Sequence, residues 1–208
     1  ARDLNGNVSD FVARKFTLNL TPFIETATPA AGPADTEVTL TGYNFGATKG
    51  VVKVGTVQVT AANITSWSNE QIKFKVPATA NGDITVQAVG TPTFSAGKPF
   101  KLETRLSVTY IYQGITSDKG PRKVDVAVYK GTTMVADLKN QTANWSAADS
   151  AYKVVTDPLP DTFGLTTGFA ATGHTISLKD STHLRRKFAA QTITRGRLNA
   201  LVRKAAAD

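Results

Sequence analysis

Hydrophobic and polar residues alternate one by one along most of the chain, from Phe16 to at least Leu178. The segment QIKFKVP (71–77) puts its hydrophobic residues on one face and its two lysines on the other, and DITVQAV (83–89) repeats this pattern. A period of two is typical of β-strands with one buried face. Turn-forming clusters such as TPAAGPAD, NFGATKG and PATANGD separate these segments. The pattern therefore predicts an antiparallel β-sandwich.

The alternation lapses in SAGKPFKLETRLSV, and a second series of strand-like segments then begins, including RKVDVAVYKG (122–131). A chain of 208 residues can hold two domains of about 100 residues each. We therefore predict an all-β protein with two immunoglobulin-like β-sandwiches in tandem. The expected divisions are an N-terminal arm or strand (1–20), an immunoglobulin-like domain (21–102), a second β-sandwich domain (106–180) and a basic C-terminal segment (181–208).

The stretch from Thr21 to about residue 100 resembles the IPT/TIG family of immunoglobulin-like domains. PFIETATPAAGPADTEVTLTGYNFG shows the family's order of features: an opening Pro-x-Ile, a Pro-x-x-Gly turn, then a strand that runs into Gly-x-Asn-Phe-Gly. VVKVGTVQV, ITSWSNEQIKFKVP and GDITVQAV resemble its later strands, although Val54 stands where an aromatic residue is more usual. The resemblance implies the sandwich fold and a packing role, with binding supplied by loops or neighbouring domains. The second domain carries no comparably specific set of motifs.

The basic residues gather near the C-terminus. The segment HLRRKFAAQTITRGRLNALVRK (183–204) holds seven Lys or Arg and no acid, in a chain of formal net charge +8. Its hydrophobic residues at 198, 201 and 202 share one face of a helix, which favours a short helix from about Leu198 to Ala207. The segment FAAQTIT (188–194) is instead predicted to form a strand. The C-terminal segment is therefore expected to be partly helical.

Composition excludes some classes of chemistry. Cysteine is absent, so the chain has no disulfide and no thiol nucleophile. It has no run of about 18 apolar residues, so no membrane span is expected. The first residue, Ala1, fits either removal of an initiator Met or cleavage of a signal peptide.

Candidate catalytic and metal-binding residues are few. The two histidines, His174 and His183, lie on either side of Asp180 and could in principle hold a metal, but exposed strand-end histidines are the simpler interpretation. Asp157 and Asp161 flank PLP, where Asp beside Pro indicates a turn rather than a pair of catalytic carboxylates. The loop GYNFG lacks the Lys-Ser/Thr of a phosphate-binding loop. We therefore expect a protein that is not an enzyme and has no metal or cofactor.

Carbohydrate binding is the more serious candidate chemistry. Aromatic side chains in the second domain could form an exposed platform on which sugar rings stack, or they could fill the core of that domain. The core interpretation is favoured, because aromatic residues in small sandwiches are usually buried. The residues concerned are Trp145, Tyr110, Tyr112 and Tyr152.

The basic segment has two interpretations. Seven phosphate contacts would give nucleic-acid binding with a log–log salt slope of roughly −6, but the segment lacks aromatic residues for base stacking apart from Phe188. Docking is therefore favoured: hydrophobic side chains would pack on a protein partner or on the second domain, and the basic ones would meet an acidic surface. The candidate docking residues are Leu184, Arg185, Arg186, Lys187, Phe188, Arg195, Arg197, Leu198, Leu201, Arg203 and Lys204.

These features lead to three functional hypotheses. The leading one is a non-catalytic structural protein, an accessory or decoration component of a phage virion or another extracellular assembly, attached through its terminal segments. It would bind protein partners, either other proteins or further copies of itself in a homo-oligomer, at a virion or cell surface. The alternative is a secreted bacterial surface module that binds polysaccharide. The third is a nucleic-acid-associated dimerisation protein, which the charge alone favours little.

Overall fold

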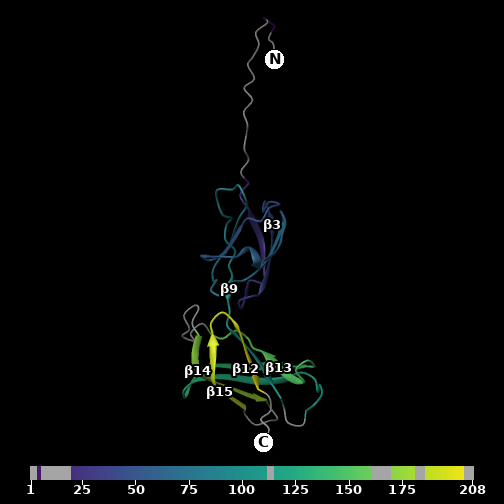
Figure 1. Cartoon of the computed structure of the whole chain (residues 1–208), viewed down its shortest axis with the longest axis vertical. Coiled ribbons are helices and arrows are strands. Elements are labelled where there is room, and N and C mark those ends of the chain that lie inside the picture. The colour runs from purple at the N-terminus through teal and green to yellow at the C-terminus, as the bar shows by residue number, and fades with distance from the viewer. Residues whose placement is uncertain (1–3, 6–19, 112–114, 161–169, 181–185, 204–208) are drawn as a thin grey trace.

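The structure is a computed structural model that describes residues 4–5, 20–111, 115–160, 170–180 and 186–203. Residues 170, 171, 186, 202 and 203 are described by their backbone alone. The described chain forms two groups of strands that lie end to end along the longest axis of the molecule (Figure 1). We call residues 20–102 the N-terminal unit and residues 105–203 the C-terminal unit.

The N-terminal unit is a sandwich of two small sheets. A four-stranded sheet has the order β1-β3-β7-β6, a three-stranded sheet has the order β5-β4-β8, and β2 pairs with β9. The elements are β1 (Phe23–Thr28), β2 (Ala31–Gly32), β3 (Glu37–Tyr43), β4 (Val51–Val54), β5 (Val57–Gln58), the 3₁₀ helix η1 (Ala61–Asn63), β6 (Ile64–Trp67), β7 (Gln71–Lys75), β8 (Ile84–Gln87) and β9 (Lys101–Leu102).

Alternation places the core of this unit as the sequence predicts. In β7, Ile72 and Phe74 are fully buried while Lys73 and Lys75 face outward. Hydrophobic side chains from both sheets join one buried cluster, so the two sheets face each other across it. Burial of this shared apolar face stabilises the sandwich.

The GYNFG loop is fastened to the turn between β6 and β7. Phe45 is fully buried, and its backbone N–H donates to the carbonyl oxygen of Asn69 at 3.1 Å. The Asn69 side-chain oxygen accepts from the N–H of Gly46 at 3.0 Å, and Trp67 Nε1 donates to the Gly46 carbonyl at 3.0 Å. The motif therefore inserts a ring into the core and is held there by hydrogen bonds.

The C-terminal unit is built on one seven-stranded sheet of order β15-β14-β11-β12-β13-β10-β16. Its two edge strands are consecutive in sequence and are joined by a tight turn, so the sheet must curl until these edges meet at that turn. A single buried cluster fills the curled sheet. The strands are β10 (Arg105–Tyr110), β11 (Arg122–Lys130), β12 (Thr133–Ser146), β13 (Ala151–Val155), β14 (Ala170–Asp180), β15 (Arg186–Thr194) and β16 (Leu198–Arg203).

The expected C-terminal helix is wrong for residues 198–203, which form β16. This strand pairs with β10 in parallel, from Arg105 opposite Leu198 to Tyr110 opposite Arg203. The spacing of the hydrophobic residues suits a helix, but pairing with a distant strand overrides that local preference. The prediction of a strand over FAAQTIT is confirmed by β15. Residues 186–194 and 198–203 thus belong to the same sheet as β10–β14.

Helix is nearly absent from the described part of the chain. Within those residues no helix has the length and apolar character needed to cross a membrane. The expected N-terminal arm (1–20) lies outside the described residues, apart from positions 4, 5 and 20.

Candidate functional site

The four aromatic residues proposed as a sugar platform do not lie together on the surface. Tyr152 is fully buried, and its hydroxyl accepts from the N–H of Lys119 and donates to the carbonyl of Gly120, each at 3.1 Å. Tyr110 is also buried and stacks on Tyr152 with ring centroids 6.2 Å apart. Both therefore belong to the core. Tyr112 lies outside the described residues.

Trp145 differs from the other aromatic residues because it is only partly buried. It lies opposite Tyr152 across the β12–β13 pair and meets that ring edge-on, with centroids 5.4 Å apart and planes at 76°. Its ring thus lies on the core side of the strand pair, and an open groove of about 540 Å³ adjoins the same residue on the outward face. We call this the Trp145 groove; its lining residues are Thr142, Asn144, Trp145, Ser146, Lys153 and Val155.

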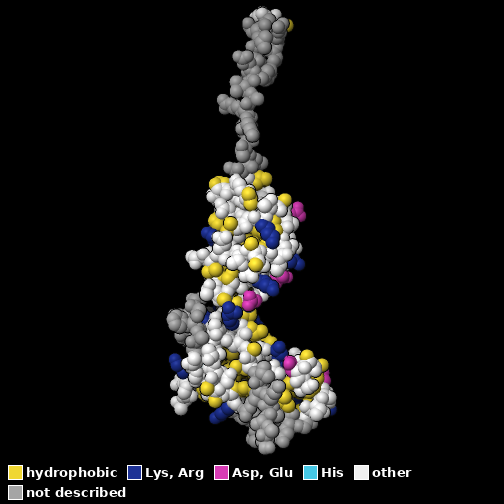
Figure 2. All heavy atoms as spheres, in the orientation of Figure 1, with side chains coloured by type: hydrophobic (Ala, Val, Ile, Leu, Met, Phe, Trp, Pro, Cys, Tyr) yellow, Lys and Arg dark blue, Asp and Glu magenta, His cyan; other side chains and the backbone are white. Residues whose placement is uncertain are grey.

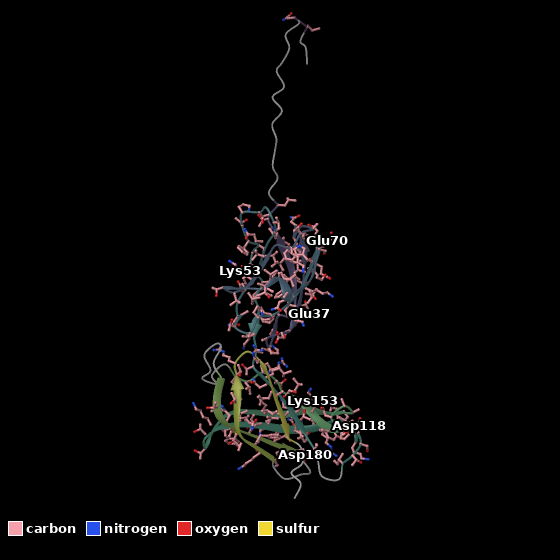
Figure 3. The ribbon with its side chains drawn as sticks, in the orientation of Figure 1. Glu37, Lys53, Glu70, Asp118, Lys153 and Asp180 are labelled. Atoms are coloured by element: carbon pink, nitrogen blue, oxygen red, sulfur yellow. The ribbon has the colours of Figure 1, made fainter. Side chains whose placement is uncertain are left out.

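The polar side chains of the Trp145 groove come from the outward faces of β12 and β13. Asn144 lies opposite Lys153 in the strand register, and both are exposed. Lys153 is labelled in Figure 3. The Thr142 hydroxyl accepts from Lys123 Nζ at 2.7 Å, and the Ser146 hydroxyl contacts Asp149 at 2.7 Å. Val155, which is 47% exposed, adds apolar surface. The groove thus combines the apolar surface of Val155 with hydroxyl, amide and ammonium groups.

A buried ion pair supports the aromatic layer behind the groove. Arg122 lies 3.5 Å from the nearly buried Asp180, and its guanidinium sits over the Tyr152 ring at 5.3 Å from the centroid. A cation over an aromatic face is attracted by the ring electrons. This arrangement fixes the ring against which Trp145 packs.

The candidate docking residues are divided between the core and the surface. Phe188 and Leu201 are buried in the core of the C-terminal unit, so their side chains cannot also pack on another protein. Lys187 and Leu198 are exposed, and Arg197 lies 3.7 Å from Asp35 of the N-terminal unit. Arg195 is half-buried. Leu184, Arg185 and Lys204 lie outside the described residues, and Arg186 and Arg203 are placed by backbone only.

The structure gives no support to a metal or paired-carboxylate site in the described residues. His174 is buried in β14, and His183 lies outside the described range. No group of three potential metal-ligating residues occurs in the described part of the chain. Asp157 is a turn anchor: its N–H donates to Gln141 Oε1 at 2.7 Å, and its carboxylate accepts from Gln141 Nε2 at 2.9 Å. Asp161 is outside the described residues.

Sequence reasoning missed a second aromatic feature, in the N-terminal unit. Phe23 and Tyr43 stack on one another, and each is 48% exposed. One signal was available: Phe23 precedes the buried Ile24, so the alternation places its ring on the solvent face of the strand. Its partner could not be identified without the strand register.

Comparison with known proteins identifies the N-terminal unit. The family model of the IPT/TIG domain matches residues 22–102. This confirms the family resemblance seen in the sequence, and with it the immunoglobulin-like fold of the unit.

Relatives of the chain include cyclomaltodextrin glucanotransferases. The enzyme of Niallia circulans is 30% identical over 75% of this chain and 22% of its own length. The enzyme of Paenibacillus macerans is 34% identical over 64% of the chain and 18% of its own length, and that of Geobacillus stearothermophilus is 38% identical over 48% and 14%. The chain therefore spans about a fifth of the length of these relatives or less.

Among solved structures, a gamma-CGTase from alkalophilic Bacillus clarkii has 17% identity and a TM-score of 0.37, covering 88% of this chain and 27% of that one. An auxiliary nutrient binding protein from Bacteroides thetaiotaomicron has 14% identity and a TM-score of 0.35, covering 86% and 50%. SGBP-B of a Bacteroides ovatus mixed-linkage glucan utilization locus, in complex with a heptasaccharide, has 11% identity and a TM-score of 0.32, covering 87% and 46%. Similarities at this level support no conclusion about the function of this chain.

Proposed function

We propose that this chain is a non-catalytic module that binds a glucan, as part of a secreted or cell-surface protein that handles such polymers. The observation that carries this proposal is the extent of the similarity to cyclomaltodextrin glucanotransferases. A match over 75% of the chain cannot fit within residues 22–102, so it extends into the C-terminal unit. The module would thus share both of its units with enzymes whose name denotes action on maltodextrin-type glucans.

A binding role fits the chain better than catalysis. The chain covers only about a fifth of the length of these enzymes. Of the two carboxylates considered for glycoside chemistry, Asp157 serves as a turn anchor, and Asp161 lies outside the described residues. We further propose that the two units are separate domains, since each has its own buried cluster.

We place the glucan in the Trp145 groove. Sugar-binding surfaces need an apolar face on which a pyranose ring packs and polar groups that exchange hydrogen bonds with its hydroxyls. The exposed side chain of Val155 supplies the first, and Asn144, Ser146 and Lys153 supply the second. Behind the groove, Trp145 packs on the buried Tyr152 and holds the two strands in place, which lowers the entropy lost on binding.

This proposal replaces the virion component as the leading hypothesis, because the relatives reported above are glucan-acting enzymes. Nucleic-acid binding gains no support: on the face shown in Figure 2, Lys and Arg side chains are spread over both units without forming one continuous patch. Protein partners remain a proposal only for the exposed residues of the basic segment, such as Lys187 and Leu198.

The test is affinity electrophoresis of the full chain in gels containing soluble starch. The wild-type chain should be retarded by starch. The retardation should be at least fivefold smaller for the Trp145→Ala variant, which removes the side chain that supports the groove from the core side. Because Trp145 also packs on Tyr152, the Asn144→Ala variant provides a second measurement at an exposed position. Met134→Ala, at the other end of β12 and 51% exposed, is the matched control and should be retarded like wild type. Equal retardation of all four proteins would refute the placement in this groove.

A further inference from the structure

An exposed aromatic pair lies at the edge of the four-stranded sheet in the N-terminal unit. Phe23, the first residue of β1, faces Tyr43, the last residue of β3, across the strand pair. Their ring centroids are 5.3 Å apart and their planes differ by 3°. Both side chains remain 48% exposed. Single exposed hydrophobic residues are ordinary on protein surfaces, but two stacked rings form a flat apolar surface of the kind that marks binding sites.

The local backbone is shaped to bring this pair together. Gly42 lies in β3 opposite Ile24 of β1, and a side chain there would overlap the carbonyl oxygen of Phe23. The absence of a Cβ thus lets β1 approach β3 closely, beside Tyr43. The strand register also shifts between Ile24 and Thr26, which places Glu25 at a bulge. Such bulges redirect a side chain at the edge of a sheet.

A polar depression of about 620 Å³ adjoins Tyr43. Two carboxylates line it, from β1 and from the turn between β6 and β7, and none of its lining residues is Lys or Arg. Figure 3 shows Glu70 toward the end of the N-terminal unit that is far from the C-terminal unit. The lining residues are Glu25, Thr41, Gly42, Tyr43, Ser68, Glu70 and Gln71.

The turn that carries Glu70 is held in place before any ligand arrives. Ser68 and Gln71 close it: the Ser68 N–H donates to the Gln71 carbonyl at 2.8 Å, and the Gln71 N–H donates to Ser68 Oγ at 3.0 Å. The Glu70 carbonyl accepts from the N–H of Gly42 at 3.0 Å, which ties the turn to β3. A preorganised rim loses little conformational entropy on binding.

We propose that this surface, the Tyr43 site, binds a neutral sugar chain. The apolar face of a pyranose ring would pack against the exposed aromatic pair, and its hydroxyl groups would donate to Glu25 and Glu70. Two carboxylates without a neighbouring cation in the lining repel sulfated or uronic sugars, which selects uncharged ones. The site lies on a different unit from the Trp145 groove, so either site can fail without the other.

Two sites on one chain would change how it holds a polymer. Once one site is occupied, the second meets another segment of the same polymer at a high effective concentration. The chain would then bind a long glucan more tightly than a short oligosaccharide that reaches only one site. The proposal therefore goes beyond a single binding groove and predicts avidity.

The direct test is amide chemical-shift mapping of the full chain by NMR, with maltoheptaose, cellohexaose and oligogalacturonate as probes. At least one neutral probe should shift the amides of Gly42, Ser68 and Glu70, and the anionic probe should not. Tyr43→Ala and Glu70→Gln should each weaken that binding at least fivefold, while Val89→Ala, an exposed hydrophobic residue of the same unit, should not.

The outcomes separate this proposal from the previous one. Shifts at Gly42 and Glu70 that persist in Trp145→Ala support the Tyr43 site even if the Trp145 groove binds nothing. Loss of all sugar binding in Trp145→Ala, with Tyr43→Ala like wild type, overturns the Tyr43 site alone. Shifts with the anionic probe but with neither neutral probe would also overturn it. If Tyr43→Ala fails to fold, the Glu70→Gln variant and the shift map still decide the question.

Discussion

The backbone N–H of Ala34 in the N-terminal unit donates a hydrogen bond to the carbonyl oxygen of Gly196, at 2.6 Å, in the turn between β15 and β16. The same glycine donates its N–H to Thr104 Oγ1 at 2.8 Å. A Cβ at this position would overlap the side chain of Leu102, so only glycine fits. The turn at Gly196 therefore connects the two units through backbone contacts.

Substitution of Gly196 by alanine should weaken this contact. Gly196 has φ +70°, and Gly131, with φ +60°, has nothing within 4 Å of a Cβ placed there. Both alanine variants should lose about 1 kcal/mol from the backbone conformation alone. Gly196→Ala should lose about 1–3 kcal/mol more, because Leu102 must shift. Denaturant unfolding measures both values, and equal losses in the two variants would contradict the importance of the contact.

Tryptophan fluorescence can follow the unfolding of each unit separately, because Trp67 lies in the N-terminal unit and Trp145 in the C-terminal unit. We expect Trp67→Phe and Trp145→Phe proteins to unfold at nearly the same denaturant concentration while Gly196 is present. In the Gly196→Ala background the two fluorescence transitions should move apart. Coincident transitions in that background would show that the turn does not couple the units.

Gly42→Ala should destabilise the N-terminal unit. A Cβ at Gly42 would overlap the Phe23 carbonyl and lie 2.8 Å from the ring of the buried Phe45. Separating β1 from β3 should lower the free energy of unfolding by about 1–3 kcal/mol, as for other overpacked sites. Thermal unfolding followed by Trp67 fluorescence provides the measurement. An unchanged midpoint would mean that β1 can move away at no cost.

The side chain of Thr156 supplies a buried hydrogen-bond acceptor. Its hydroxyl oxygen accepts from the N–H of Leu106 at 3.1 Å, and Thr156 is fully buried. Thr156→Val keeps the shape but leaves that N–H without its acceptor, so we expect a loss of about 1–3 kcal/mol. Thr65→Val, which removes an exposed hydroxyl, should change the free energy of unfolding by less than about 0.5 kcal/mol. Chemical denaturation of both variants tests the difference.

The pKa of Asp125 lies below its usual value, chiefly because its carboxylate accepts a hydrogen bond from the backbone N–H of Asn140 at 3.0 Å, and also because Lys139 is near. A lowered pKa in the folded state stabilises the protein above the ordinary carboxyl pKa, and this contribution is lost as the pH falls through the lowered value. The melting temperature of Asp125→Asn should therefore depend less on pH between about pH 5 and pH 2 than that of wild type.

The Lys139→Met variant separates the two causes. Lys139 is largely exposed and pairs with both Asp125 and Asp137. Because the Asn140 amide is the larger cause, most of the pH dependence attributed to Asp125 should survive in this variant. If the dependence disappears together with the lysine, the charge is the main cause instead.

Alternation predicted the strands of the N-terminal unit well because each of them buries one face against a single core. In β3, Val38 and Leu40 are buried as the sequence pattern requires. The fate of the last strand could not be predicted in this way. Leu198 is 45% exposed and Leu201 is buried, an arrangement that depends on the pairing of β16 with β10, about 90 residues away in sequence. Local spacing carries no information about such a partner.

The candidate sites show the same limit. The sequence could propose Tyr110, Tyr152 and Trp145 as one aromatic group, and the rings do contact one another, but they do so on the core side of the curled sheet, which the sequence alone could not place. The position of Arg122 over Tyr152 depends on how β11 pairs with β12 and β12 with β13, and the sequence alone does not give this register. The stacking of Phe23 on Tyr43 could not be predicted from the sequence, because twenty residues separate the two and each taken alone is an ordinary surface aromatic residue.

The parallel pairing of β10 with β16 has a mechanical consequence. β10 is entered from the N-terminal unit, and the chain leaves β16 at the opposite end of the same strand pair. A pulling force applied along the chain before β10 and after β16 would therefore slide the two strands past each other and stretch the hydrogen bonds between them together. Strands loaded in this direction resist rupture more than strands that peel apart one bond at a time. A module anchored on one side and holding a polymer on the other would benefit from a joint that withstands tension.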